Sequence, residues 1–298
     1  MLRLCVFLLL SGPALAQTNW DTVKIRPLQL AGNLYMMTGA GGNMALLTGA
    51  EGNLLVDDQF AQLSDKIKAA IATLDPGSIR FVINTHLHGD HTGGNENFKK
   101  IGVTLMAHDN VRARMMKGTT DRNGNPVPPR NPDAWPMVTF ESNLNVHLNG
   151  QDVELVHLDR GHTDGDVMIR FRQANVIHTG DAFVRGRYPI IDRGSGGSFL
   201  AYIHSLSLIY GAADDQTRVI PGHGALGSRA DVKALHDVLV DIRDQVAAAL
   251  KKGTKVEDIP ALGITDKYDP QLGQGFIKGK DFVLMVAEQI KASMGAGK

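Results

Sequence analysis

The chain has 298 residues, and its 31 lysine and arginine side chains balance its 31 aspartate and glutamate side chains. A net charge of zero, with no basic run, excludes the electrostatic footprint of a nucleic-acid-binding protein, so we expect no nucleic-acid partner. Hydrophobic residues make up 43% of the chain and charged residues 21%, which leaves core material for one large α/β domain or two small ones.

The N-terminus has the pattern of a secretory signal peptide. Arg3 precedes the apolar run 4–10, and a Ser-Gly-Pro break leads to Ala14-Leu15-Ala16 before Gln17. These are the charged, apolar and cleavage regions of such a signal, and the run is too short to span a bilayer. We therefore expect residues 1–16 to be removed and the mature protein, without a membrane span, to act in the periplasm or outside the cell. The alternative is a buried amphipathic N-terminal helix.

The only cysteine, Cys5, lies inside this segment. The mature chain would then contain no cysteine, which excludes disulfides, thiolate metal ligands and a cysteine nucleophile. Any metal must be held by histidine and aspartate.

The first half of the mature chain alternates strands and helices. Residues 20–57 predict strands joined by glycine turns, the clearest at 34–37, 44–47 and 54–56. Apolar residues at helical spacing from Leu63 to Leu74 predict a helix that Asp75-Pro76-Gly77 ends. The elements expected next are a strand at 79–83, a helix from about 94, a strand at 103–107 and a helix at 108–117.

An irregular stretch, 118–136, divides the chain, and loops of this length are often functional. The strands expected after it are 138–140, 145–148, 153–158, 167–171, 176–178 and 218–220, with a helix at 199–210. Ser228 and Asp231 resemble a capping box that opens a helix ending at Gly253. A last helix is expected at about 281–294. We expect one domain over 17–252, with 253–298 as a helical appendage packed on it and covering part of the site.

The segment Thr85-His86-Leu87-His88-Gly89-Asp90-His91 packs three imidazoles and one carboxylate behind the apolar strand 79–83. Such a strand end presents its side chains at the edge of a sheet, and imidazole and carboxylate are preferred zinc ligands. His86 and His88 can close on one metal, while Asp90 and His91 can reach a second. The alternative is a polar loop that is rich in histidine.

Three further strand ends carry residues of the same kind: His162, Asp181 and His223. We expect these strands to converge on one sheet edge, where the seven side chains suit two metals.

Together the motifs H-x-H-x-D-H, G-H-T-x-G-D, T-G-D and P-G-H-G resemble those of the metallo-β-lactamase superfamily, in family order and over nearly all of the mature chain. The resemblance implies an α/β fold, a four-layer αβ/βα sandwich with the site between two sheets. It implies two zinc ions, the first bound by His86, His88 and His162, the second by Asp90, His91 and His223, with Asp181 bridging them.

Other residues are candidates for supporting roles. Asp57 matches the family's acidic position behind the ligands and would orient the site, or it caps the following helix. Asn95, Arg185 and Tyr188 are candidates for substrate contact, the alternative being packed or solvated side chains.

The resemblance implies a hydrolase of small molecules in which a hydroxide shared by two zinc ions opens a carbonyl bond of an ester, lactone, thioester or β-lactam. Asp90 or Asp181 would hold the nucleophile and take its proton. His88, in place of glutamate, resembles the zinc hydrolases more than the di-iron oxidoreductases. Asp181 is similar to the bridging residue of glyoxalase II-like thioesterases, whereas the best-known β-lactamases have cysteine or a non-ligand there.

Several alternatives stay open. Export favours a dedicated class B-type β-lactamase. A mononuclear iron sulfur dioxygenase would not need His91 and His223, and a non-catalytic zinc-binding relay protein would not need an open site. Iron or manganese could also replace zinc.

Overall fold

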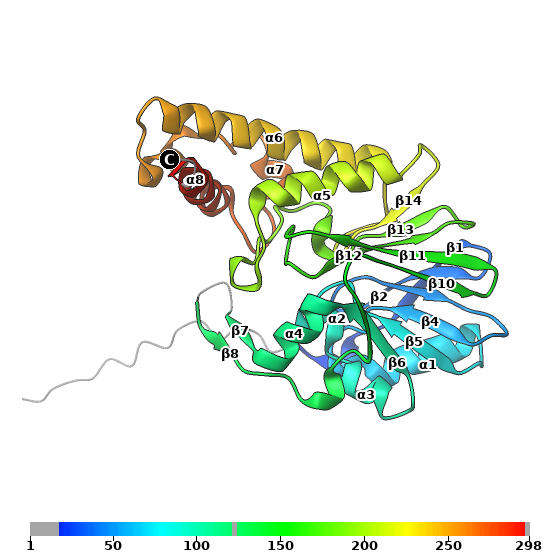
Figure 1. Cartoon of the computed structure of the whole chain (residues 1–298). Helices are drawn as coiled ribbons and strands as arrows, with labels where there is room; N and C mark the ends of the chain where they lie inside the picture. The colour runs from blue at the N-terminus through cyan, green and yellow to red at the C-terminus, as the bar shows by residue number, and fades with distance from the viewer. Residues whose placement is uncertain (1–17, 121–123, 296–298) are drawn as a thin grey trace, which may run out of the picture.

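Two β-sheets face each other, and helices cover the outer side of each (Figure 1). The computed structural model describes residues 18–120 and 124–295, so the expected signal peptide lies outside the described residues. Helix, sheet, sheet and helix form four layers. The predicted four-layer αβ/βα sandwich is confirmed.

The first sheet has seven strands, and its inner strands are apolar on both faces because both faces are covered. In β3, Met44 and Leu46 face the helices, whereas Ala45 and Leu47 face the other sheet. Strands β4, β5, β6 and β9 run parallel to one another. The strand order is β1 (Arg26–Ala31), β2 (Leu34–Thr38), β3 (Met44–Leu47), β4 (Asn53–Val56), β5 (Ile79–Ile83), β6 (Thr104–His108) and β9 (Val138–Phe140).

The second sheet has six strands and is antiparallel except for the pair β13 and β14. Residues such as Leu155, Ile169 and Ile220 pack against the first sheet and form the core between the two. The strand order is β10 (Asn143–Leu148), β11 (Gln151–Leu158), β12 (Asp166–Phe171), β13 (Val176–His178), β14 (Arg218–Ile220) and β15 (Gly227–Ser228).

The helices bury apolar stripes on the outer faces of the sheets. Ile67 and Ile71 of α1 and Phe98 of α3 pack on the first sheet, and α5, α6 and α8 share one cluster on the second. The helices are α1 (Ser64–Leu74), α2 (Gly89–Thr92), α3 (Asn95–Lys99), α4 (Asp109–Lys117), α5 (Phe199–Ala212), α6 (Arg229–Lys251), α7 (Asp269–Leu272) and α8 (Gly279–Gly295). Short 3-10 turns are η1 (Trp20–Thr22), η2 (Ala61–Leu63), η3 (Pro132–Ala134), η4 (Gly180–Ala182), η5 (Arg193–Ser195) and η6 (Val256–Leu262).

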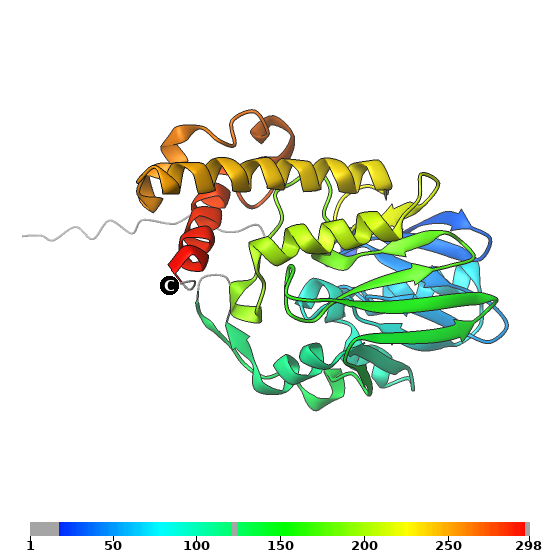
Figure 2. The same cartoon turned by 45° about the horizontal axis from the view of Figure 1, so that its top comes forward.

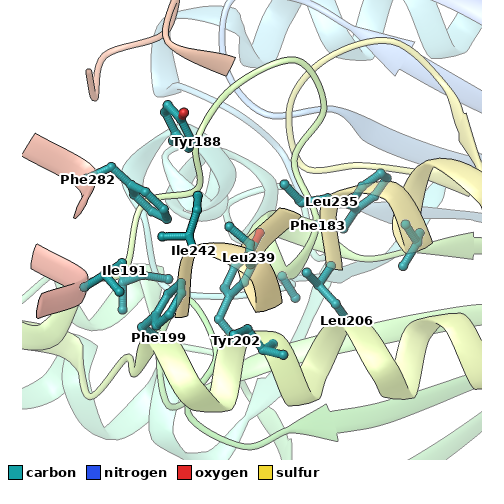
Figure 3. Packing of buried hydrophobic residues seen from close by; sticks show 14 of the residues in the cluster. Phe183, Tyr188, Ile191, Phe199, Tyr202, Leu206, Leu235, Leu239, Ile242 and Phe282 are labelled. Atoms are coloured by element: carbon teal, nitrogen blue, oxygen red, sulfur yellow. The ribbon is translucent and has the colours of Figure 1, made fainter. Parts of the chain in front are cut away.

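Helix α6 begins at the predicted capping box. The Ser228 side chain accepts a hydrogen bond from Asp231 N, and the Asp231 carboxylate accepts one from Ser228 N. Leu239 and Ile242 of α6 pack among aromatic residues of α5 and α8 (Figure 3). The buried residues of α6 recur at helical spacing along one face: Val232, Leu235, Leu239, Ile242 and Val246.

The C-terminal segment packs on the second sheet's helices. Helix α8 runs across α6 (Figure 2) and buries Phe282, Val286 and Ile290 in the same cluster. Phe282 also stacks on Tyr188, with ring centroids 4.7 Å apart. This contact ties the segment to the loop that follows Asp181.

The stretch 118–136, expected to be irregular, contains η3 and a hairpin of β7 (Thr119–Thr120) and β8 (Pro126–Val127), whose residues 121–123 are not described. Strands of two residues are too short to show a period in the sequence. Within 18–120 and 124–295, none of the helices has the length and apolar character needed to cross a membrane.

Candidate metal centre

The structure brings the seven predicted ligand residues together at one edge of the sandwich. His86 and His88 follow β5, Asp90 and His91 lie in the one-turn helix α2, and Asp181 lies in η4 after β13. The other two, His162 and His223, follow β11 and β14. All come from segments beyond strand ends, where side chains are not needed for the core.

Ligand atoms of these residues lie within 4.8 Å of one another in three overlapping groups. The groups are His86, His88 and His162; His86, His91 and Asp181; and Asp90, His91 and His223. No other such group is found among the described residues.

Asp181 lies between the first and third groups. Its Oδ1 is 3.3 Å from His91 Nε2 and 3.5 Å from His223 Nε2. Its Oδ2 is 3.7 Å from His162 Nε2. The two carboxylate oxygens therefore face different groups.

The donor set fits divalent metal ions. His86 Nε2, His91 Nε2 and Asp181 Oδ1 are buried and have no hydrogen-bond partner, although such atoms in folded proteins are nearly always paired. Burial, reinforced by the neighbouring histidines His91 and His162, holds the pKa of His86 well below its usual value. A neutral imidazole is the form that binds metal.

The carboxyl groups of Asp90 and Asp181 are ionised and therefore attract a cation into the cluster. Burial alone would raise the pKa of Asp90, but His91 and His223 bring it down to about 2. Burial opposes ionisation of Asp181 too, and His223 and His91 hold its pKa well below the usual range. Burial lowers the pKa of His91, but Asp90, Asp57 and Asp181 outweigh it and raise the pKa well above its usual value. The cluster is built to hold a cation.

Four histidines are oriented by a hydrogen bond at the ring nitrogen that faces away from the cluster. His86 Nδ1 is 3.0 Å from Thr85 Oγ1, and His162 Nδ1 is 2.7 Å from the carbonyl of Ile190. The others, His91 and His88, are paired with Asp57 and Asp192. Such partners fix the tautomer and direction of metal-binding histidines.

Asp57 is fully buried behind the cluster and does not cap η2 or α1. Its Oδ2 is 2.7 Å from His91 Nδ1 and accepts a bond from Thr85 Oγ1, while Oδ1 accepts one from Thr85 N at 2.7 Å. Its φ of 60° is a strained value that aspartate tolerates better than most residues. The position agrees with an orienting role.

Asp192 is a residue of this site that the sequence did not reveal. Its Oδ2 is 2.8 Å from His88 Nε2, and its Oδ1 accepts a bond from Ser195 N. Burial raises the pKa of Asp192, but the bonds from His88 and Ser195 bring it to about 2. It lies in an irregular segment 104 positions from His88, without a motif around it.

Asp192→Asn is expected to weaken the binding of a divalent metal ion, tested with zinc, about tenfold, because the amide is a weaker partner for His88 than a carboxylate. The expected loss of affinity is at the lower end of the 10- to 100-fold range for such supporting residues. The His88 side chain is 29% exposed, so water can replace part of its contact with Asp192. Competition titration against a chromophoric chelator measures the affinity. Asp214→Asn, at an exposed aspartate in the turn between α5 and β14 and outside the cluster, is the control. Equal affinities for Asp192→Asn and the unaltered protein would contradict an orienting role.

Two of the three candidates for substrate contact are engaged elsewhere. Asn95 has no exposed surface. Its side-chain amide exchanges hydrogen bonds with the side chain of Asn84 and donates one to the carbonyl of Ala134. Arg185 pairs with Asp231 at 2.7 Å and lines a cavity away from the cluster. Both side chains are hydrogen-bonded within the fold, and neither lines the cavities beside the cluster.

Tyr188 lines a small cavity beside His88 and Asp90, but its hydroxyl donates to Asp269 Oδ1 at 2.7 Å. Arg187, two positions after Arg185, lines this cavity and a larger one of about 770 Å³ that also reaches Asp90 and His223. Nothing in the neighbouring sequence distinguishes the roles of these two arginines.

The family model described as the metallo-beta-lactamase superfamily matches residues 37–223. A metallo-beta-lactamase from Pontibacter korlensis is similar in structure, with a TM-score of 0.61 and 16% identity over 73% of this chain and 100% of that one. The DIM-1 metallo-beta-lactamase exposed to ceftazidime has a TM-score of 0.58 and 17% identity over 73% of this chain and 97% of that one. At these identities the likeness shows the fold alone. No curated protein sequence matches the chain.

Proposed function

The chain belongs to the metallo-beta-lactamase superfamily and is a metal-dependent hydrolase, and we propose that it uses two zinc ions to open a carbonyl bond in a small molecule. The bond would be that of an ester, lactone, thioester or β-lactam. The proposal includes export of the mature chain to the periplasm or the outside of the cell.

The observation that carries the proposal is the place of Asp181 between two complete ligand groups. One ion would be held by His86, His88 and His162, and the other by Asp90, His91 and His223. The two oxygens of Asp181 face these groups separately, which supports a bridging carboxylate. A mononuclear iron site would leave the group of Asp90, His91 and His223 without a purpose.

When bound, the two ions supply Lewis acidity for the carbonyl oxygen and lower the pKa of a water molecule to about 7. The side chains decide where the proton goes. Asp90 is 28% exposed and lines two cavities beside the cluster, whereas Asp181 is 9% exposed. Asp90 is thus the carboxylate that a reacting water reaches, and it takes the proton. Asp181 holds the two ligand groups in place.

Zinc suits the donor set because the described residues of the cluster offer imidazole and carboxylate. Imidazole also binds iron, so metal content must be measured together with activity.

The test is hydrolysis of a panel by the zinc-loaded protein: an ester, a γ-lactone, a thioester and the chromogenic β-lactam nitrocefin. We expect kcat/KM of ~10⁴ M⁻¹s⁻¹ or more on at least one substrate, which is the lower range of working enzymes. A chelator should abolish turnover, and added zinc should restore it. Mass spectrometry should find two zinc ions per chain.

The panel also separates the alternatives. Turnover of nitrocefin alone would favour a dedicated β-lactamase in which Asp181 stands at the bridging position. One iron ion per chain, with no hydrolysis, would replace the proposal by the iron sulfur dioxygenase. Two zinc ions without turnover of any substrate would favour a zinc-binding relay protein.

Export is tested separately. N-terminal sequencing of the protein recovered from the periplasm should begin at Gln17. Recovery of a chain that still begins at Met1, from the cytoplasm alone, would contradict it.

A further inference from the structure

The segment 273–278, between α7 and α8, forms part of the wall beside the metal centre. Its Phe276 lines two of the cavities that reach the cluster, the small one beside His88 and Asp181 and the larger one beside Asp90 and His223. Phe276 is 80% exposed, more than any other large hydrophobic residue in the described part of the chain. This segment lies beyond residues 37–223, the part that the family model matches.

The segment is anchored on both sides. Tyr188 N donates to the carbonyl of Leu272 at 3.1 Å, and the Tyr188 hydroxyl donates to Asp269. Tyr188 also stacks on Phe282 of α8, as Figure 3 shows. Lys278 Nζ donates to the carbonyl of Gly273 at 2.9 Å, which closes the segment on itself. The backbone that carries the exposed Phe276 ring is therefore held by contacts on both sides.

Gly275 lets this segment approach the site closely. A Cβ atom placed there would be 3.0 Å from Arg187 Cβ, so a larger residue would push the segment outward. Arg187 belongs to the loop after Asp181 and lines the same two cavities as Phe276. The close approach places the segment against the loop that carries Arg187.

The larger cavity has room for a substantial organic group. Its volume of about 770 Å³ falls in the range of small-molecule sites. A second aromatic residue, Phe60, lines it from a segment more than two hundred positions earlier, together with the glycine turn 39–41. The walls thus offer aromatic surface close to Asp90 and His223.

We propose that Phe276 is a specificity-determining residue that binds an apolar or aromatic acyl group of the substrate. This rests on the proposed hydrolase function and names the substrate class: carbonyl compounds with an aryl or bulky apolar group next to the bond that is cut. An exposed aromatic ring on a fixed segment loses little freedom on binding, and aromatic contacts add to the gain from burial.

The test compares ethyl acetate with ethyl phenylacetate in a pH-stat, with zinc-loaded protein. We expect Phe276→Ala to lower kcat/KM on the phenylacetyl ester roughly tenfold, mainly through KM, and to change the acetyl ester less than twofold. Phe276→Tyr keeps the ring and should keep the preference. Leu262→Ala, at a residue of η6 that is 52% exposed, is the matched control and should change neither ester.

Equilibrium binding of phenylacetate and acetate, measured by isothermal titration, decides the inference even without turnover. Phenylacetate should bind more tightly than acetate, and Phe276→Ala should remove most of the difference. Equal losses for both ligands, or no loss for either, would overturn the role of Phe276. Failure of the whole substrate panel, with phenylacetate still bound through Phe276, would count against the hydrolase proposal and leave the binding site standing.

Discussion

His162→Ala should bind fewer zinc ions than the unaltered protein and lose nearly all hydrolytic activity. His162 Nε2 lies 2.8 Å from His88 Nδ1 in the first ligand group and 3.7 Å from Asp181 Oδ2. Alanine removes one metal-ligating nitrogen of the first group. It also removes the contact between that group and Asp181 Oδ2. The loss in kcat/KM should exceed the roughly 100-fold that loss of a supporting residue costs. Metal content by mass spectrometry, together with the substrate panel, measures both effects.

His204→Ala is the control for this change. His204 is exposed on α5 and outside the cluster, so metal content and activity should stay as in the unaltered protein. Two zinc ions and full activity in His162→Ala would remove the basis for the metal centre.

The second large effect is expected at Asp57. Asp57→Asn replaces two acceptor oxygens by one, although both His91 Nδ1 and Thr85 N–H depend on this carboxylate. The side chains of Asp57 and His91 are 0% exposed, so water does not replace the lost acceptor. An amide N–H facing His91 Nδ1 would favour the tautomer with its proton on Nε2, the atom that would bind metal. Zinc affinity should fall 10- to 100-fold.

The free energy of unfolding should fall by about 1–3 kcal/mol in the same variant, the cost of one unsatisfied buried donor. Urea unfolding and chelator competition measure the two effects. Asp65→Asn, at a side chain that is 94% exposed in the first turn of α1, should leave both unchanged. Unchanged zinc affinity in Asp57→Asn would show that His91 is not oriented by this carboxylate.

Much of the fold could be predicted from the sequence because the signals are local. The strand 44–47, the inward face of α6 and the capping box at Ser228 depend on residues a few positions apart. The ligand residues were found for a similar reason, since each follows a strand end within a short motif.

Contacts between distant segments could not be predicted in this way. Asn95 follows the histidine cluster directly, yet it is fully buried and bonded to Asn84 and Ala134. Asp192 has no motif around it but lies against His88. Neither outcome is encoded in nearby residues, because both depend on which segments the fold places side by side.

Local sequence patterns predicted the strands, the helices and the histidines and aspartates at the strand ends, and the resemblance of the motifs to the metallo-β-lactamase superfamily implied the four-layer sandwich. Period-two and period-3.6 patterns depend only on residues close together in the chain, so they can be read from the sequence. The absence of cysteine after Cys5 is likewise a matter of composition. Only the tertiary structure shows that Asp192 lies against His88 and that the C-terminal segment brings Phe276 to the site. These contacts join residues far apart in the chain, and only packing of the two sheets and their helices brings such residues within a few ångströms.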